Sequence, residues 1–133
     1  PDENTFVFDY HMRNQRRIIK LDGASVPGER SKLGQSIGRM EGDALVVETS
    51  NFAADRWGSF TGVDSSEQKH LVERYSLVDG GMTLRVQMTL TDPVYLARPV
   101  EIDWYLKKLA DRKPLPANCT VESARLYIEA GYQ

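Results

Sequence analysis

The chain has 133 residues, of which 41% are hydrophobic and 27% are charged, as in an ordinary globular domain. Its 17 basic and 19 acidic residues give a net charge of -2, which lacks the basic excess of a dedicated nucleic-acid-binding protein. No apolar run approaches the ~20 residues of a membrane span, and a single cysteine, Cys119, excludes an internal disulfide. We therefore expect one domain over residues 1–133, without a nucleic-acid partner or a membrane span.

The first half of the chain predicts two β-hairpins, formed by residues 6–10 with 16–21 and by residues 36–40 with 44–49. In the first hairpin, apolar residues recur at every second position, which is typical of a half-buried strand. The second hairpin has a Glu-Gly-Asp turn at residues 41–43, where glycine accepts the positive φ of a tight turn.

The second half predicts three further strands at residues 70–78, 83–91 and 100–106. Strict alternation is clearest over 83–91, where every even position is apolar and every odd position is polar. An Asp-Gly-Gly turn at 79–81 joins the first two of these strands. Pro93 lacks the N–H that a ladder requires, so the middle strand should end before it.

Two segments interrupt this series of strands. Residues 52–69 form a long connection that carries Trp57 and Phe60, and these side chains could close the mouth of a barrel as a lid or fill its end as a plug. The tail 119–131 has the composition of a short C-terminal helix capped by Thr120, an assignment that we favour slightly over an irregular tail.

Seven strands with short connections predict a mainly β protein. We expect an antiparallel meander that closes as a small β-barrel, lipocalin-like, with a β-sandwich as the alternative. No strand–helix–strand rhythm is present, which argues against a Rossmann-type fold.

Alternation directs four polar side chains toward an otherwise apolar interior: Arg17, Glu73, Tyr10 and Tyr75. An unpaired buried carboxylate is costly, so Glu73 requires a partner. The interpretation that we favour is an ion pair between Arg17 and Glu73 that only satisfies itself, or a slight twist of the strands that lets both groups reach water at the barrel mouth. The alternative is that these groups line a ligand cavity, as convergent polar groups in apolar pockets often do.

Signals for metal, cofactor or thiol chemistry are weak. His11 and His70 lack the spacing of metal ligands, so we expect no metal site. Cys119 has no basic neighbours to activate its thiol. Residues 34–38 match the Gly-x-Ser-x-Gly spacing of a nucleophile elbow, but a strand is predicted after the serine where the elbow requires a helix. We interpret that match as chance and expect no cofactor.

Residues 34–52 read GQSIGRMEGDALVVETSNF, which resembles the motif GHSxGRWEGDTLVVETxxF of a largely uncharacterised family of bacterial, often exported proteins. The resemblance spans about residues 15–100 and includes an Arg-Arg-Ile lead-in, a Glu-Arg-Tyr strand and an Asp-Pro turn. It implies a small β-rich domain in the periplasm or outside the cell, with a cytoplasmic location as the alternative. Gln35 and Met40 stand where the family has histidine and tryptophan, and residues 63–66 replace a loop that contains histidine.

Two functions compete for the same interior. The first is binding of a small apolar or aromatic molecule, with these ligand-binding residues: Arg17, Tyr10, Trp104, Trp57 and Met88. The second is a cofactor-free isomerase, lyase or cyclase in the same cavity. In that case Glu73 would be the general acid or base and Tyr75 or Tyr10 a hydrogen-bond donor, while Arg17 would stabilise developing negative charge. A protein-interaction module with a filled core is a third option, and a homodimer stays open.

Overall fold

A computed structural model describes residues 4–10, 15–21, 23 and 28–110, together with Glu122 and Arg125. Strands make up most of this part of the chain: β1 (Thr5–Tyr10), β2 (Gln15–Leu21), β3 (Gln35–Glu41), β4 (Ala44–Ser50), β5 (Asp55–Phe60), β6 (Val63–Ser65), β7 (His70–Val78), β8 (Thr83–Thr91) and β9 (Val100–Lys107). A short 3-10 turn, η2 (Asp79–Gly81), joins β7 to β8. All seven predicted strands are confirmed, each to within one residue at either end.

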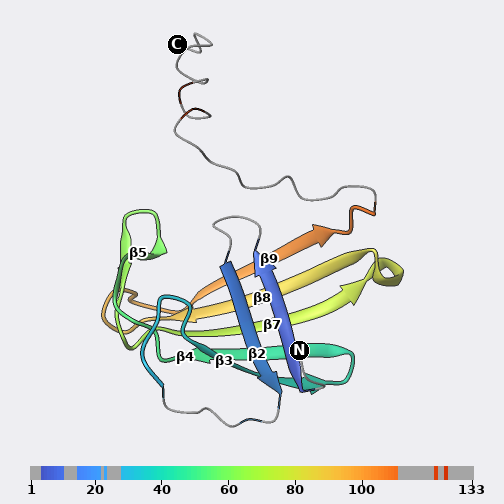
Figure 1. Ribbon diagram of the computed structural model, residues 1–133, viewed down its shortest axis with the longest axis horizontal. Helices are drawn as coiled ribbons and strands as arrows, with labels where there is room; N and C mark the ends of the chain where they lie inside the picture. Colours follow the sequence, from blue (N-terminus) through green and yellow to red (C-terminus); the bar gives the residue numbers. More distant parts are fainter. Residues whose placement is uncertain are drawn as a thin grey trace.

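Seven of the strands form one curled sheet in the order β1-β2-β3-β4-β7-β8-β9 (Figure 1). Each of the seven strands has an antiparallel neighbour on at least one side as predicted, but the expectation of a wholly antiparallel meander is wrong at one place. Strands β2 and β3 are parallel, with Ile19 opposite Ser36 and Leu21 opposite Gly38. Parallel neighbours require a long connection, and residues 22–34 provide it.

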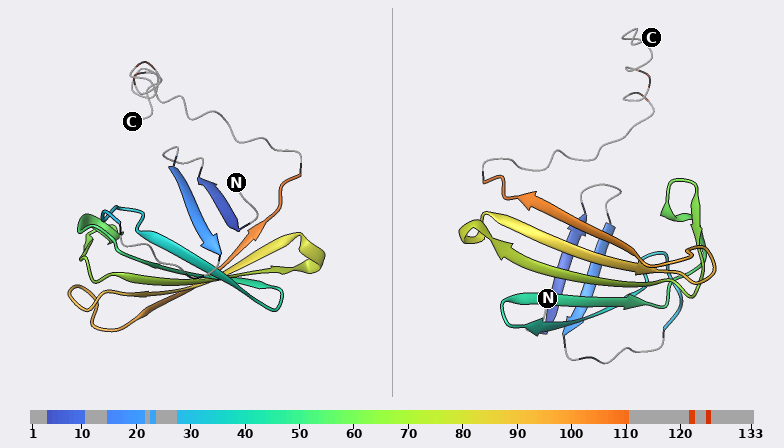
Figure 2. Two further views of the ribbon diagram at one scale, coloured as in Figure 1. Left: turned by 60° about the horizontal axis from the view of Figure 1, so that its bottom comes forward. Right: turned by 180° about the vertical axis from the view of Figure 1, so that it is seen from behind.

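The expected closed barrel is also wrong, and so is the sandwich alternative. Among the described residues the sheet ends at β1 on one side and at β9 on the other, so the protein is an open half-barrel. Figure 2 shows the curl of the sheet, with the β1–β2 hairpin crossing the direction of β7, β8 and β9. Closure would require β1 to reach β9, and the steep crossing directs the hairpin across the concave face instead.

The long connection 52–69 is not the irregular loop that we expected. It contains a small two-stranded sheet made of β5 and β6. Lys69 lies beneath it, with its ammonium 4.1 Å from the centre of the Phe52 ring and donating a 3.0 Å hydrogen bond to the carbonyl of Gly58. The predicted C-terminal helix over 119–131 lies outside the described residues, apart from Glu122 and Arg125.

The hydrophobic core lies between the β1–β2 hairpin and strands β4 and β7. Its centre is formed by Ile19, Leu45 and Val47, all buried. Phe8 packs edge-on against Tyr75 with ring centres 5.1 Å apart, which joins β1 directly to β7. The crossing hairpin therefore covers only one part of the concave face and leaves the strands toward β9 uncovered.

This partial cover corrects the expectation, drawn from the alternation over residues 100–106, that Trp104 is a core residue. Alternation places Trp104 on the concave face, as expected, but 53% of the residue is exposed, so Trp104 does not belong to a buried core. Leu77 and Leu106 on the same face are also more than half exposed. A strand can direct its apolar side chains inward and still leave them in water when no strand lies opposite.

Candidate functional site

An apolar groove on the concave face is the candidate site, and we call it the concave groove. It has a volume of about 530 Å³ and lies between β1 on one side and β7, β8 and β9 on the other. Eleven residues line it: Val7, Phe8, Asp9, Tyr10, Glu73, Tyr75, Leu84, Val86, Met88, Trp104 and Leu106. Most of these side chains are aliphatic or aromatic, and the volume is within the ~300–1,000 Å³ that small-molecule sites usually have.

Strand register explains why these residues meet. Opposite residues in an antiparallel sheet share a face, and Tyr75, Val86 and Trp104 form one such row across β7, β8 and β9. Glu73 with Met88 forms part of the row on one side of it, and Leu84 with Leu106 part of the row on the other side. The groove is therefore a direct product of the alternation in three consecutive strands.

A buried ion pair forms the polar floor of the groove. The Arg17 guanidinium on β2 donates a hydrogen bond to Oε2 of Glu73 on β7, and both side chains are at least nine-tenths buried. Tyr75 donates a 2.8 Å hydrogen bond to the other carboxylate oxygen, Oε1. Both oxygens of Glu73 thus have a donor.

Two hydroxyl groups hold the Arg17 guanidinium from the side of β3 and β4. Its Nε donates to Oγ of Ser36 over 2.7 Å, and its Nη2 donates to Oγ1 of Thr49 over 2.5 Å. The two hydroxyl oxygens are 2.9 Å apart and share a hydrogen bond. Tyr10 is a further, weaker acceptor at 3.5 Å from Nη1.

The network determines the protonation of its members. Burial by itself would lower the pKa of Arg17, but the hydrogen bond and negative charge of Glu73 raise that pKa above its ordinary value. Burial and the neighbouring Glu73 carboxylate raise the pKa of the Tyr75 hydroxyl well above its ordinary value. Arg17 therefore stays charged, and Tyr75 remains a hydrogen-bond donor.

Five of the predicted site residues line one surface, namely Glu73, Tyr75, Tyr10, Trp104 and Met88. Arg17 lies behind them and contacts the groove through Glu73 and Tyr10. Trp57 does not belong to this set. It lies on β5, 59% exposed, and is neither a lid nor a plug of the concave groove.

Ser36 and Thr49 were not predicted as site residues, although a signal for them exists. A two-residue turn at Gly42 and Asp43 fixes the register of its hairpin, and this register places Ser36 directly opposite Thr49. Both therefore lie beside the inward-facing side of β2, where Arg17 needs acceptors. Counting outward from the turn would have identified them.

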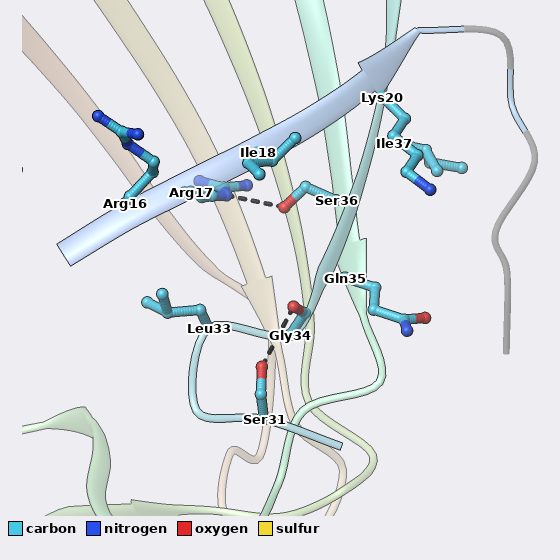
Figure 3. Close-up of a pocket in the computed structure, with 10 residues that line it drawn as sticks. All are labelled: Arg16, Arg17, Ile18, Lys20, Ser31, Leu33, Gly34, Gln35, Ser36 and Ile37. Atoms are coloured by element: carbon cyan, nitrogen blue, oxygen red, sulfur yellow. Dashed lines mark hydrogen bonds between the residues drawn. The ribbon is translucent and has the colours of Figure 1, made fainter. Parts of the chain in front are cut away.

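A second hollow, shown in Figure 3, lies between β2 and the segment that leads into β3. It exists because the parallel pairing starts only at Ile19 and Ser36, so the first half of β2 diverges from residues 31–35. Its volume is about 360 Å³. Arg17 faces Ser36 here through the hydrogen bond already described, and Arg16 is engaged by Asp9.

The described residues contain no group of three or more histidine, cysteine, aspartate or glutamate side chains that could hold a metal ion. His11 and Cys119 lie outside the described residues. Ser36 sits inside strand β3, so the Gly-x-Ser-x-Gly spacing does not form a nucleophile elbow, as predicted. No helix in the described ranges is long and apolar enough to cross a membrane.

Comparison of the chain with protein-family models, with curated proteins and with solved structures gave no match.

Proposed function

We propose that the protein binds a small apolar or aromatic molecule in the concave groove. The observation that carries this proposal is the exposure of Trp104 and Leu106 on a concave face whose floor is closed by Tyr75, Val86 and the Arg17–Glu73 pair. A ligand that covers water-exposed apolar side chains around a hollow removes apolar surface from water, which lowers the free energy of the complex.

The geometry gives less support to acid–base catalysis by Glu73. A general base must be within reach of a substrate proton and must have an oxygen available to accept it. In Glu73, Arg17 engages one oxygen and Tyr75 the other. The raised pKa of Tyr75 also makes it a poor proton donor near neutral pH. Positioning a ligand's polar group is the role that suits this pair best.

The direct test is a titration with N-phenyl-1-naphthylamine, an uncharged aromatic probe that becomes fluorescent in an apolar environment. We expect saturable binding at one site per chain. Leu84→Glu introduces a charge into the groove and should weaken binding at least about tenfold, because a ligand would then have to desolvate a carboxylate. Gln87→Glu adds the same charge to the opposite face of β8 and should leave binding unchanged.

Two further variants keep the test informative if Leu84→Glu unfolds. Tyr10→Ser removes an aromatic ring from the edge of the groove and should also weaken binding, whereas Trp57→Ala should have no effect because Trp57 lies elsewhere. Absence of saturable binding by the unmodified protein would refute the proposal. Equal loss in the Leu84→Glu and Gln87→Glu variants would place the probe outside the groove.

A further inference from the structure

Strand β9 is a long edge strand whose only protection is the charged side chains on its convex face. Among the described residues, no strand pairs with its outer side. It pairs with β8 over eight consecutive residues without a register shift, and it contains no proline. Natural edge strands are usually interrupted by bulges or prolines, or carry inward-pointing charges that prevent pairing with another chain. In β9, Trp104, Tyr105 and Leu106 are instead more than half exposed.

Two charged residues of β9 have no ion-pair partner within the described part of the chain, Glu101 and Lys107. The other two charged residues on the convex face of β8 and β9, Arg85 and Asp103, pair with each other at 2.7 Å. Glu101 and Lys107 have opposite charges and lie on the same, convex face of the strand, six positions apart. Both are exposed.

This pattern is complementary to itself. When a strand pairs antiparallel with a copy of itself around a twofold axis, opposite residues share a face, so even-numbered residues must oppose even and odd must oppose odd. With the axis beside Trp104, Glu101 lies opposite Lys107 of the partner subunit, and the converse pair forms as well. On the concave face, Ile102 then lies opposite the partner's Leu106, and Trp104 opposite the partner's Trp104.

The neighbouring registers are less favourable. An axis beside Asp103 places that carboxylate opposite the partner's Asp103, and like charges directly opposite are destabilising. An axis beside Tyr105 places Asp103 opposite the partner's Lys107, but Asp103 is already engaged by Arg85, and Glu101 then lies opposite a partner leucine. Only the register centred on Trp104 pairs Glu101 with Lys107, the two charges of β9 that have no partner within the described part of the chain, while Asp103, already paired with Arg85, lies opposite the partner's Tyr105.

We propose that the protein forms a homodimer in which β9 pairs antiparallel with β9 of a second copy, with Trp104 opposite the partner's Trp104. The curled sheet then continues across the dimer axis, and the two concave grooves meet at the paired tryptophans. Each copy contributes Trp104 to the boundary of the other's groove. The dimer does not depend on a ligand, so it stands or falls separately from the proposed binding function.

Charge reversal tests the register. Sedimentation equilibrium should give twice the mass of one chain, with the dimer dissociating on dilution. Lys107→Glu and Glu101→Lys each convert two attractive cross-strand pairs into two repulsive ones and should weaken dimerisation roughly tenfold. The double variant restores opposite charges and should dimerise as the unmodified protein does. A double variant as weak as the single variants would overturn the proposed register.

Cysteine cross-linking tests the axis directly, in a Cys119→Ser background. Directly opposite residues have Cβ atoms roughly 4.5–5.5 Å apart, close enough for an oxidant to form a disulfide with small movements. Trp104→Cys should therefore cross-link efficiently, whereas Asp103→Cys and Tyr105→Cys, which would face themselves only in the two rejected registers, should not. Faster cross-linking of either control overturns the register. A monomer at every concentration, or assemblies that keep growing with concentration, overturns the closed dimer.

Discussion

Arg17 on β2 and Glu73 on β7 form a buried ion pair across the half-barrel, although 56 positions separate them in the chain. The pair links the β1–β2 hairpin to the central strands of the sheet. Its charges are balanced, and Tyr75, Ser36 and Thr49 provide the remaining hydrogen bonds. The pair therefore holds the two walls of the concave groove together.

The first prediction is that Glu73→Gln lowers the free energy of unfolding by about 3 kcal/mol, because it leaves the Arg17 charge buried without a counter-charge. Urea-induced unfolding followed by circular dichroism measures the loss. Glu41→Gln is the matched control. It removes a carboxylate that pairs with Arg39 and Arg74 at the surface, where solvent screens the interaction, and should change little. Similar losses in both variants would mean that the Arg17–Glu73 pair is not specially sensitive to loss of charge.

A second prediction concerns Asp92, which is buried at the end of β8. Its carboxylate accepts hydrogen bonds from the backbone N–H and the hydroxyl of Ser66, at 2.6 Å and 2.7 Å, and from the N–H of Val94 at 3.1 Å. Burial raises the pKa of Asp92, but the hydrogen bonds outweigh burial and hold that pKa below its ordinary value of 3.8.

Because the pKa of Asp92 is lower in the folded than in the unfolded chain, its carboxylate stabilises the fold at neutral pH. This contribution is lost as the pH falls below about 4 and through the folded-state pKa. Asp92→Asn should thus cost about 1–3 kcal/mol at pH 7, and the difference from the unmodified protein should shrink in acid. Unfolding midpoints across this pH range measure it, with Asp79→Asn in an exposed turn as the control. A difference that is constant with pH would contradict the ionic explanation.

The third prediction separates backbone strain from lack of space. Gly34 and Gly42 have nearly the same positive φ, +65° and +60°. A Cβ on Gly34 would lie 2.6 Å from the carbonyl oxygen of Ser50, whereas a Cβ on Gly42 would have no atom within 4 Å. Gly42→Ala should cost about 1 kcal/mol for the left-handed backbone alone. Gly34→Ala should lower the free energy of unfolding by roughly 2 kcal/mol more than Gly42→Ala does, because the backbone at Ser50 must move to make room for the new Cβ. Thermal unfolding of the two variants compares them, and equal losses would show that Gly34 is not sterically constrained.

The local pattern of the sequence was sufficient to predict all seven strands of the main sheet and the faces of most of them. Period-two alternation over 83–91 needs no knowledge of distant residues, because successive side chains on a strand point to opposite faces. The hairpin turns at 41–43 and 79–81 likewise set the register of their flanking strands. The inward positions of Arg17, Glu73 and Tyr75 follow from the same local rule.

Whether the sheet closes was decided only by the tertiary structure. Alternation is the same in a closed barrel and in an open half-barrel, so it could not show that β1 crosses the concave face and never reaches β9. No hairpin turn joins β2 to β3, and no periodic signal in residues 22–34 predicts that these two strands pair in parallel. For this reason the sequence determined that Trp104 faces the concave side, whereas only the tertiary structure decided that it remains exposed there, because none of the described strands lies opposite it.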